Sequence, residues 1–290
     1  MAAVSGSVSA PKPVKTTIAP RRGLFHLDLG ELWRYRELGV FFVWRDIKVK
    51  YKQTVIGATW AIIQPVILMI VFAVIFGRYG GRALAPPKDI PAPIFYFSAL
   101  LIWTYFAQAL QVSTGSVLSQ QVTITRVYFP RLMLPLAGTL PGLVDFAMSF
   151  LVMAVLMVTY GVPFSVRMAV IPLLVVYAAL TAFGAGMLLS ATNAIYRDIR
   201  EGTPFFIQVL MFMSVILPAR KLASEASKGI AWIYGLNPVA GIVEASRWAI
   251  IGRGRFPFEL VLPGLAVTAL LLITGVIYFR RIEDVMVDLV

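Results

Sequence analysis

The sequence predicts an all-α membrane protein with six transmembrane helices, an N-terminal amphipathic interface helix and short re-entrant helices on the outer side. Of the 290 residues, 59% are hydrophobic and only 14% are charged, whereas soluble proteins carry about 25% charged residues. Five apolar stretches have the roughly 18 residues that a helix needs to cross a bilayer, and a sixth is slightly shorter. Ten of the 26 Lys and Arg residues precede the first of these stretches.

The N-terminal region divides into a tail and a helix. Residues 1–20 are small and polar and lack the apolar segment of a signal peptide, so we expect a disordered cytoplasmic tail over residues 1–22. Residues 23–54 are predicted to hold an amphipathic helix that abuts the first span. At 100° per residue, its apolar face holds Val40, Val43, Trp44, Ile47 and Tyr51, and a second face holds Arg45, Lys48 and Lys52. Such a helix lies in the interface with its cations near anionic lipid, where it either acts only as an anchor or takes a further role.

The transmembrane domain is predicted over residues 55–290. Its spans are expected at 55–77, 94–112, 132–160, 168–194, 204–218 and 258–279. The third span is longer than one crossing needs, so we expect it to tilt or break near Pro135 and Pro141. Six crossings place both termini on one side of the membrane, and the cluster of Lys and Arg before the first span predicts that this side is the cytoplasm.

The outer segment 222–251 is expected to form two short helices. Asn237 is a favourable N-cap, Pro238 suits the first helical position, and Gly252 follows the last turn. A helix from 238 to 251 would be about 21 Å long, which is too short to cross a bilayer. Two interpretations stay open: a re-entrant pair covered by other protein, or a pair lying in the interface with Trp232, Tyr234 and Trp248 as belt aromatics.

The composition excludes several kinds of chemistry. The chain has no cysteine and one histidine, His26, so disulfides, thiolate nucleophiles, histidine triads and multi-histidine metal sites are excluded. We therefore predict no catalytic residue and no metal site. The net charge of +12 would suit nucleic acid, but in a membrane protein it more often marks flanks that face anionic lipid. Membrane lipid, not nucleic acid, is the expected partner.

Two inner segments add a polar surface on the cytoplasmic side. Residues 113–131, "STGSVLSQQVTITRVYFPR", are rich in Ser, Thr and Gln, and residues 196–204, "YRDIREGTP", alternate in charge. Together with the N-terminal helix they could dock a soluble partner. Each could instead be an ordinary solvated loop.

Four motifs carry a resemblance to a known family. "WRDIKVKYKQTVIGATWAIIQP", "RVYFPRLMLPLAGTLPGLVDF", "NAIYRDIR" and "LNPVAGIVEASRWAIIG" resemble the permease subunit of bacterial polysaccharide ABC exporters. That family handles O-antigen, capsule and teichoic-acid chains, and the similarity covers the chain from about residue 30 to its C-terminus.

The resemblance implies a homodimer in the bacterial inner membrane that works with two copies of a separate ABC-type nucleotide-binding subunit. The chain would then be no enzyme and hold no cofactor, because ATP and Mg would bind to the partner. The sequence itself lacks the G-x-x-x-x-G-K-[ST] phosphate loop. By the same resemblance, residues 113–126 form the coupling helix within the loop 113–131. Contacts with the ATPase are then expected at Ser119, Gln120, Gln121, Thr123, Thr125, Arg126 and Tyr128.

A lipid-linked glycan places two demands on such a permease. Its pyrophosphate head needs cations at the inner leaflet. The candidates for this site or for an inner gate are Arg45, Lys48, Tyr51, Lys52 and Arg197. Its hydroxyl-rich chain needs aromatic faces and hydrogen-bonding groups, for which the candidates are Trp60, Gln64, Tyr96, Trp103, Tyr105 and Gln108. Each of these aromatics could instead pack helices or sit at the membrane interface.

Two rival functions depend on the acidic residues. Asp145 lies inside the third span, where a carboxylate costs about 2.5–3.5 kcal/mol on insertion scales. It could be the proton site of a proton-coupled secondary transporter, or it could accept a hydrogen bond from a neighbouring helix, which we prefer. A membrane-embedded glycosyltransferase is the least favoured function, because the acids outside the C-terminal Glu283, Asp284 and Asp288 are scattered.

Overall fold

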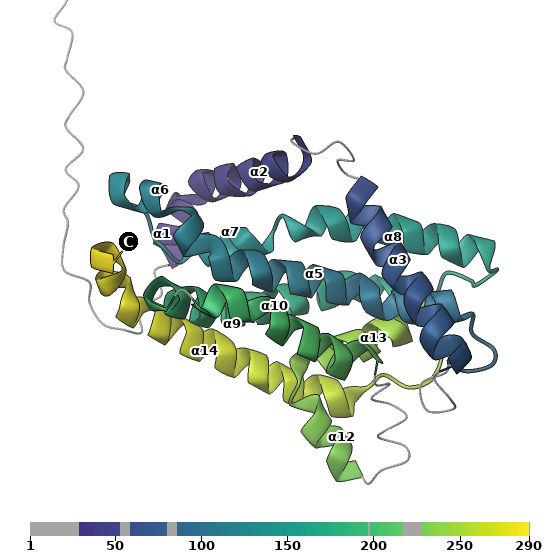
Figure 1. The fold of residues 1–290 in the computed structure, drawn as a ribbon. Helices are drawn as coiled ribbons and strands as arrows, with labels where there is room; N and C mark the ends of the chain where they lie inside the picture. Colours follow the sequence, from purple (N-terminus) through teal and green to yellow (C-terminus); the bar gives the residue numbers. More distant parts are fainter. Residues whose placement is uncertain (1–28, 53–58, 80–85, 197, 217–227, 290) are drawn as a thin grey trace, which may run out of the picture.

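The computed structural model describes residues 29–52, 59–79, 86–196, 198–216 and 228–289. Within these ranges the regular structure is helical, without a β-strand. Six helical segments are long and apolar enough to cross a membrane, which confirms the prediction of an all-α membrane protein with six spans. Most of them run in a common direction, and the first span crosses the others obliquely (Figure 1). The segments are Thr59–Tyr79, Ala92–Ser119, Met133–Thr159, Val166–Ile195, Asp198–Ile216 and Phe258–Glu283.

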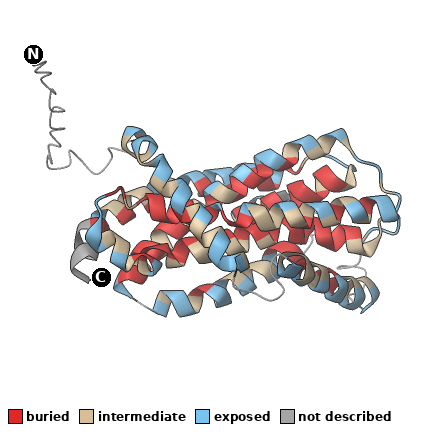
Figure 2. Ribbon diagram, turned by 90° about the horizontal axis from the view of Figure 1, so that it is seen from above, coloured by how far each residue is buried: buried red, intermediate tan, exposed pale blue. Residues whose placement is uncertain are grey.

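The second span, α5 (Ala92–Ser119), forms the centre of the bundle. In its most apolar stretch 78% of the residues are buried, against 17% in the first span. It packs against α9 (Ile171–Ile195), which packs in turn against α14 (Phe258–Leu289). Buried residues run through the middle of the bundle and exposed ones follow its rim (Figure 2). Glycine allows α9 and α14 to approach closely: a Cβ on Gly184 would lie 3.0 Å from the backbone of Leu271.

Hydrogen bonds between spans join the central helices. The Asn193 amide of α9 donates to the carbonyl of Thr114 at 3.2 Å, and the Ser113 hydroxyl donates to the carbonyl of Pro135 at 3.1 Å. The hydroxyl oxygens of Thr181 and Thr268 lie 2.9 Å apart between α9 and α14. In lipid the hydrophobic effect does little to hold helices together, so packing and such polar contacts supply much of the specificity.

The second span continues seven residues past its predicted end at 112. Residues 113–119 were expected in the coupling segment, yet they extend α5, and Ser113, Thr114, Ser116 and Val117 are buried. The Thr114 and Ser116 hydroxyls donate to carbonyls one turn back, at 2.8 Å to Leu110 and at 2.7 Å to Ser113, and the Ser113 hydroxyl donates to Pro135 in the third span. Because these polar groups are satisfied within the bundle, they do not end the helix. The helix ends at Gln120, and a separate short helix, α6 (Gln121–Arg126), follows.

The third span is broken at one of its two prolines. α7 (Met133–Thr139) ends just before Pro141, and α8 (Gly142–Thr159) begins after it, as predicted. Pro135 causes no break because it lies in the first turn of α7, where the backbone N–H has no helical partner. The short 3₁₀ helix η2 (Val166–Val170) then leads into α9.

The fifth span begins earlier than predicted. Residues 198–203 were expected in a loop, but they form the first turns of α10 (Asp198–Met211), which the π-helical η3 (Phe212–Ile216) extends. Asp198 and Glu201 lie in its first turn, where acidic side chains stabilise the positive end of the helix dipole. The first span consists of α3 (Thr59–Val74) and η1 (Ile75–Tyr79), and its predicted start at 55–58 lies outside the described residues.

The outer segment contains two helices of different exposure. α13 (Pro238–Ile251) has the predicted caps: the Asn237 side chain accepts from the Val239 N–H, and Gly252 has φ 72°. Twelve of its 14 residues are buried, and it packs against α5, α9 and α14. α12 (Lys228–Gly235) instead exposes Trp232 and Ile233. Residues 222–227 of the predicted outer pair lie outside the described part.

The N-terminal helix is split into α1 (Leu29–Arg34) and α2 (Arg36–Lys52). α2 packs beside α7 (Figure 1). Its buried residue is Phe42, whose ring lies 5.6 Å from that of Phe129. Phe42 is on the opposite side of the helix from Val40 and Trp44, which are exposed. Part of the predicted apolar face of α2 therefore points away from the helix bundle. The tail 1–22 and residues 23–28 and 53–54 lie outside the described residues.

Candidate functional site

A cavity of about 870 Å³ lies between the first, second, third and fifth spans and the end of α2. α2 contributes Lys50 and Tyr51, and α8 contributes Asp145 and Ser149. The remaining described lining comes from α3 (Trp60, Ala61, Gln64, Pro65, Leu68), α5 (Trp103, Thr104, Ala107, Gln108) and α10 (Pro204, Ile207, Gln208, Met211). Five helices drawn from residues 36 to 211 thus share one concave site.

The lining combines apolar walls with uncharged polar groups. Three glutamine amides face the cavity, from Gln64, Gln108 and Gln208. Each amide can both donate and accept hydrogen bonds. Trp60 and Trp103 supply broad aromatic surfaces with one N–H donor each. Such a combination suits a ligand that carries many hydroxyl groups on an apolar frame.

The charged groups of the lining are joined at the end of α2. The Asp145 carboxylate accepts hydrogen bonds from the Lys50 ammonium and from the Tyr51 hydroxyl. Burial raises the pKa of the Tyr51 phenol, and its hydrogen bond to Asp145 raises it further, so the phenol stays protonated and can donate. Asp145 is therefore compensated by partners on another helix. This is the arrangement we preferred over a proton site.

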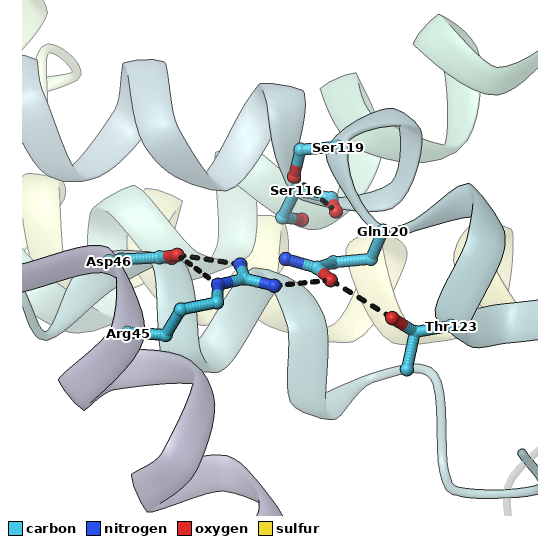
Figure 3. Close-up of polar contacts among 6 residues, drawn as sticks. All are labelled: Arg45, Asp46, Ser116, Ser119, Gln120 and Thr123. Atoms are coloured by element: carbon cyan, nitrogen blue, oxygen red, sulfur yellow. Dashed lines mark hydrogen bonds and ion pairs between the residues drawn. The ribbon is translucent and has the colours of Figure 1, made fainter. Parts of the chain in front are cut away.

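α2 is also joined to the segment between the second and third spans. The Arg45 guanidinium donates to the Gln120 side-chain oxygen at 2.7 Å and to the Asp46 carboxylate at 2.6 and 3.1 Å (Figure 3). The same Gln120 oxygen accepts from the Thr123 hydroxyl at 3.3 Å. Gln120 is only 5% exposed and lies at the junction of α5 and α6. A side chain of α2 thus contacts the residue at which the central helix ends.

The coupling residues expected from the resemblance differ in exposure. Gln120 is buried, whereas Ser119 is exposed and its hydroxyl donates back to the carbonyl of Ser116 at 2.9 Å. Gln121 and Thr123 are half-buried on α6. Thr125, Arg126 and Tyr128 are exposed beyond them, together with the apolar Val122 and Val127. The exposed group forms a small mixed surface that another protein could contact.

A buried ion pair lies at the other end of the bundle, on α13. The Arg247 guanidinium donates to the Glu244 carboxylate at 2.7 Å, and the two side chains are 3% and 7% exposed. Arg247 also donates to the carbonyl of Val215 at 2.6 Å and lies 4.5 Å from the centroid of the Phe95 ring. We did not predict this site. The signal was the i, i+3 spacing of opposite charges within an otherwise apolar helix.

The cavity gathers four of the six residues expected to line a pathway, namely Trp60, Gln64, Trp103 and Gln108. Tyr96 and Tyr105 do not line it. Both are 1% exposed in the core, where Tyr105 donates to the carbonyl of Thr139 at 3.3 Å. Aromatic packing between helices is the alternative that we had left open for these positions.

The predicted inner cations do not form a common cluster. Arg45 contacts Asp46 and Gln120, while Lys48 and Lys52 are exposed and line no part of the cavity. Tyr51 does line it, and Arg197 lies outside the described residues. The cation that reaches the cavity is Lys50, which we had not singled out. Nothing in the sequence indicates that residue 50 meets residue 145.

No group of three or more His, Cys, Asp or Glu residues that could hold a metal occurs in the part of the chain that the structure describes. The cavity presents amides, hydroxyls, aromatic rings and the Lys50–Asp145 ion pair.

Sequence comparisons agree with the resemblance noted above. Residues 39–251 match the sequence profile of a family described as ABC-2 type transporter. The chain is 25% identical to the O-antigen export system permease protein RfbA of Myxococcus xanthus, over 84% of this chain and 91% of that protein. A protein of the same name from Klebsiella pneumoniae is 24% identical, over 88% and 95%. The polysialic acid transport protein KpsM of Escherichia coli is 23% identical, over 83% and 92%.

Proposed function

The chain belongs to the ABC-2 type transporter family, and from this premise we propose that it is the permease subunit of an exporter that moves a lipid-linked polysaccharide across the inner membrane. The names of the relatives support this, since they are O-antigen export permeases and polysialic acid transport proteins. The single observation that carries the proposal is the cavity, whose amides and tryptophans suit a hydroxyl-rich chain.

The permease works as a homodimer in this proposal. The spans beside the cavity support it: only 17% of the first span and 22% of the fifth are buried within one chain. A second copy packed against these two spans would cover them. It would also close the open side of the cavity and bring the same set of lining residues to face the first set.

A separate ABC-type ATPase supplies the energy. It would dock on the exposed surface of α6 and the residues after it, where Thr125, Arg126 and Tyr128 project. Movement of α6 would reach α2 through the contact of Arg45 with Gln120, and α2 ends in the Lys50–Tyr51–Asp145 contact at the cavity. Both termini are cytoplasmic in this arrangement.

The test is transport by the purified complex. The chain and its ATPase, co-expressed and reconstituted in liposomes, should move a lipid-linked glycan only when ATP is hydrolysed. An ATPase variant in the phosphate-loop lysine should abolish the movement. Transport that follows a pH gradient without ATP would overturn the proposal in favour of a proton-coupled carrier.

A variant of Arg45 tests the coupling route. We expect Arg45→Ala to lower the amount of glycan moved per ATP hydrolysed several-fold while the ATPase still binds, because the link between α6 and α2 is lost. Lys48→Ala is the matched control, since Lys48 is an exposed cation of the same helix whose described contact is the Trp44 ring, at 5.5 Å. An equal effect of the two variants would show that general charge, not this contact, matters.

A further inference from the structure

The charge balance of the cavity bears on the chemical class of its cargo. Among the described lining residues, Lys50 and Asp145 are the charged ones, and they form an ion pair with each other. All the other described polar groups of the lining are uncharged: three amides, two hydroxyls, two indoles and one phenol. The described wall of the cavity therefore has no net charge.

An acidic polymer would meet an unfavourable environment there. Each carboxylate that leaves water needs a cation or several hydrogen-bond donors to compensate the lost hydration. The Lys50 ammonium is already neutralised by Asp145, so an incoming carboxylate would have to displace an anion that the Tyr51 hydroxyl also holds. A second copy of the chain would add the same residues and leave the balance unchanged.

A neutral glycan meets the opposite situation. Its hydroxyls can exchange hydrogen bonds with water for bonds to the amides of Gln64, Gln108 and Gln208, which both donate and accept. Its apolar ring faces can stack on Trp60 and Trp103. A neutral glycan carries no charge along its length that would have to leave water. It can therefore bind in the cavity without being held too tightly to move on.

We infer that the cavity selects an uncharged polysaccharide and disfavours polyanionic chains such as polysialic acid. The inference rests on the proposed function and specifies its substrate class. It assigns the Lys50–Asp145 pair the role of keeping the cavity neutral. It also separates this chain from the relatives that are named for polysialic acid transport.

The electrostatic part is tested with a single thiol, which is possible because the chain has no cysteine. Gln108→Cys, purified in nanodiscs, is labelled with a cationic and an anionic methanethiosulfonate of similar size, and each rate is divided by the rate for a free thiol. We expect the two normalised rates to agree within about twofold. Gln208→Cys provides an independent position on α10.

Removing one charge of the Lys50–Asp145 pair should make the two normalised labelling rates differ. Which reagent then reacts faster should depend on which of the two charges is removed. Lys50→Gln should raise the normalised rate of the cationic reagent roughly fivefold, and Asp145→Asn should raise that of the anionic reagent equally. This is the factor for a unit charge taken to act over about 8 Å at an effective dielectric constant near 40. The inference is overturned if Gln108→Cys and Gln208→Cys, both with the Lys50–Asp145 pair intact, react much faster with the same one of the two reagents. Because these proteins decide the test, misfolding of the variants that lack one charge of the pair does not remove it.

The ligand class is tested by protection of the same thiol. Neutral glucose oligomers at millimolar concentration should slow labelling of Gln108→Cys, whereas α2,8-linked sialic acid oligomers of equal length should protect at least fivefold less. Equal or better protection by the sialic acid oligomers would overturn the inference, and so would protection by neither. ATP-driven transport in liposomes is measured separately, so the proposed function can stand when this inference fails.

Discussion

Removing the charge of Glu244 should strand a buried cation and destabilise the outer end of the bundle. The variant Glu244→Gln keeps the shape of the side chain but leaves Arg247, which is 3% exposed, without its counter-ion. Breaking a buried pair in this way costs about 3–5 kcal/mol. The lower end is expected here, because Arg247 keeps its hydrogen bond to Val215 and its contact with the Phe95 ring.

The assay is thermal unfolding of the purified chain in detergent at one scan rate, followed by tryptophan fluorescence. A loss of about 3 kcal/mol corresponds to a fall in Tm of roughly 6–12 °C at 2–4 °C per kcal/mol. The matched control is Asp89→Asn. It breaks the Arg253–Asp89 pair, whose side chains are 61% and 76% exposed. Exposed pairs contribute at most about 1 kcal/mol.

Two outcomes would refute this reasoning. If Glu244→Gln lowers the Tm no more than Asp89→Asn does, burial does not strengthen the pair. The double variant Glu244→Gln with Arg247→Met removes the stranded charge and should recover part of the loss. A double variant as unstable as the single one would show that the unpaired guanidinium is not the cause.

The remaining predictions concern helix packing and pH. Gly186→Ala should lower stability by about 1–3 kcal/mol, because its Cβ would lie 2.1 Å from the Ser113 hydroxyl oxygen and 2.6 Å from the Ser113 Cβ. Gly115→Ala, with nothing within 4 Å, should instead be neutral or stabilising, and the two variants are compared by detergent unfolding. The Tyr51 phenol has a pKa raised above its usual 10.0. The stabilisation of the folded state by the protonated phenol is therefore complete below pH 10 and declines as the pH rises above it. In a pH series of unfolding midpoints, Tyr51→Phe should lack this alkaline decline. Midpoints that fall equally steeply with pH above 10 in wild type and variant would contradict the prediction.

Local chemistry explains why parts of the fold could be predicted. The helix 238–251 was expected with its bounds because Asn237 and Gly252 act on adjacent backbone groups. The break at Pro141 follows from the missing N–H of one residue. The end of α5 was misplaced because Ser and Thr side chains were taken as signs of a loop, whereas in the bundle Thr114 and Ser116 bond to their own helix.

Contacts between distant residues could not be predicted in the same way. The periodicity of α2 indicated two faces, but the partners of each face depend on how the helix docks. Phe42 was not on the predicted apolar face, yet it contacts Phe129. Lys50 and Asp145 are 95 positions apart, and the Arg45–Gln120 contact spans 75.

The membrane class, the six spans and the caps of the outer helix were predictable from local sequence, because bilayer thickness and backbone hydrogen bonding act over one helix at a time. The meeting of Lys50, Tyr51 and Asp145 at a cavity lined by amides and tryptophans is a property of the folded bundle. That site depends on the relative placement of five helices, and the packing that fixes this placement has no periodic signal in the sequence of any one of them.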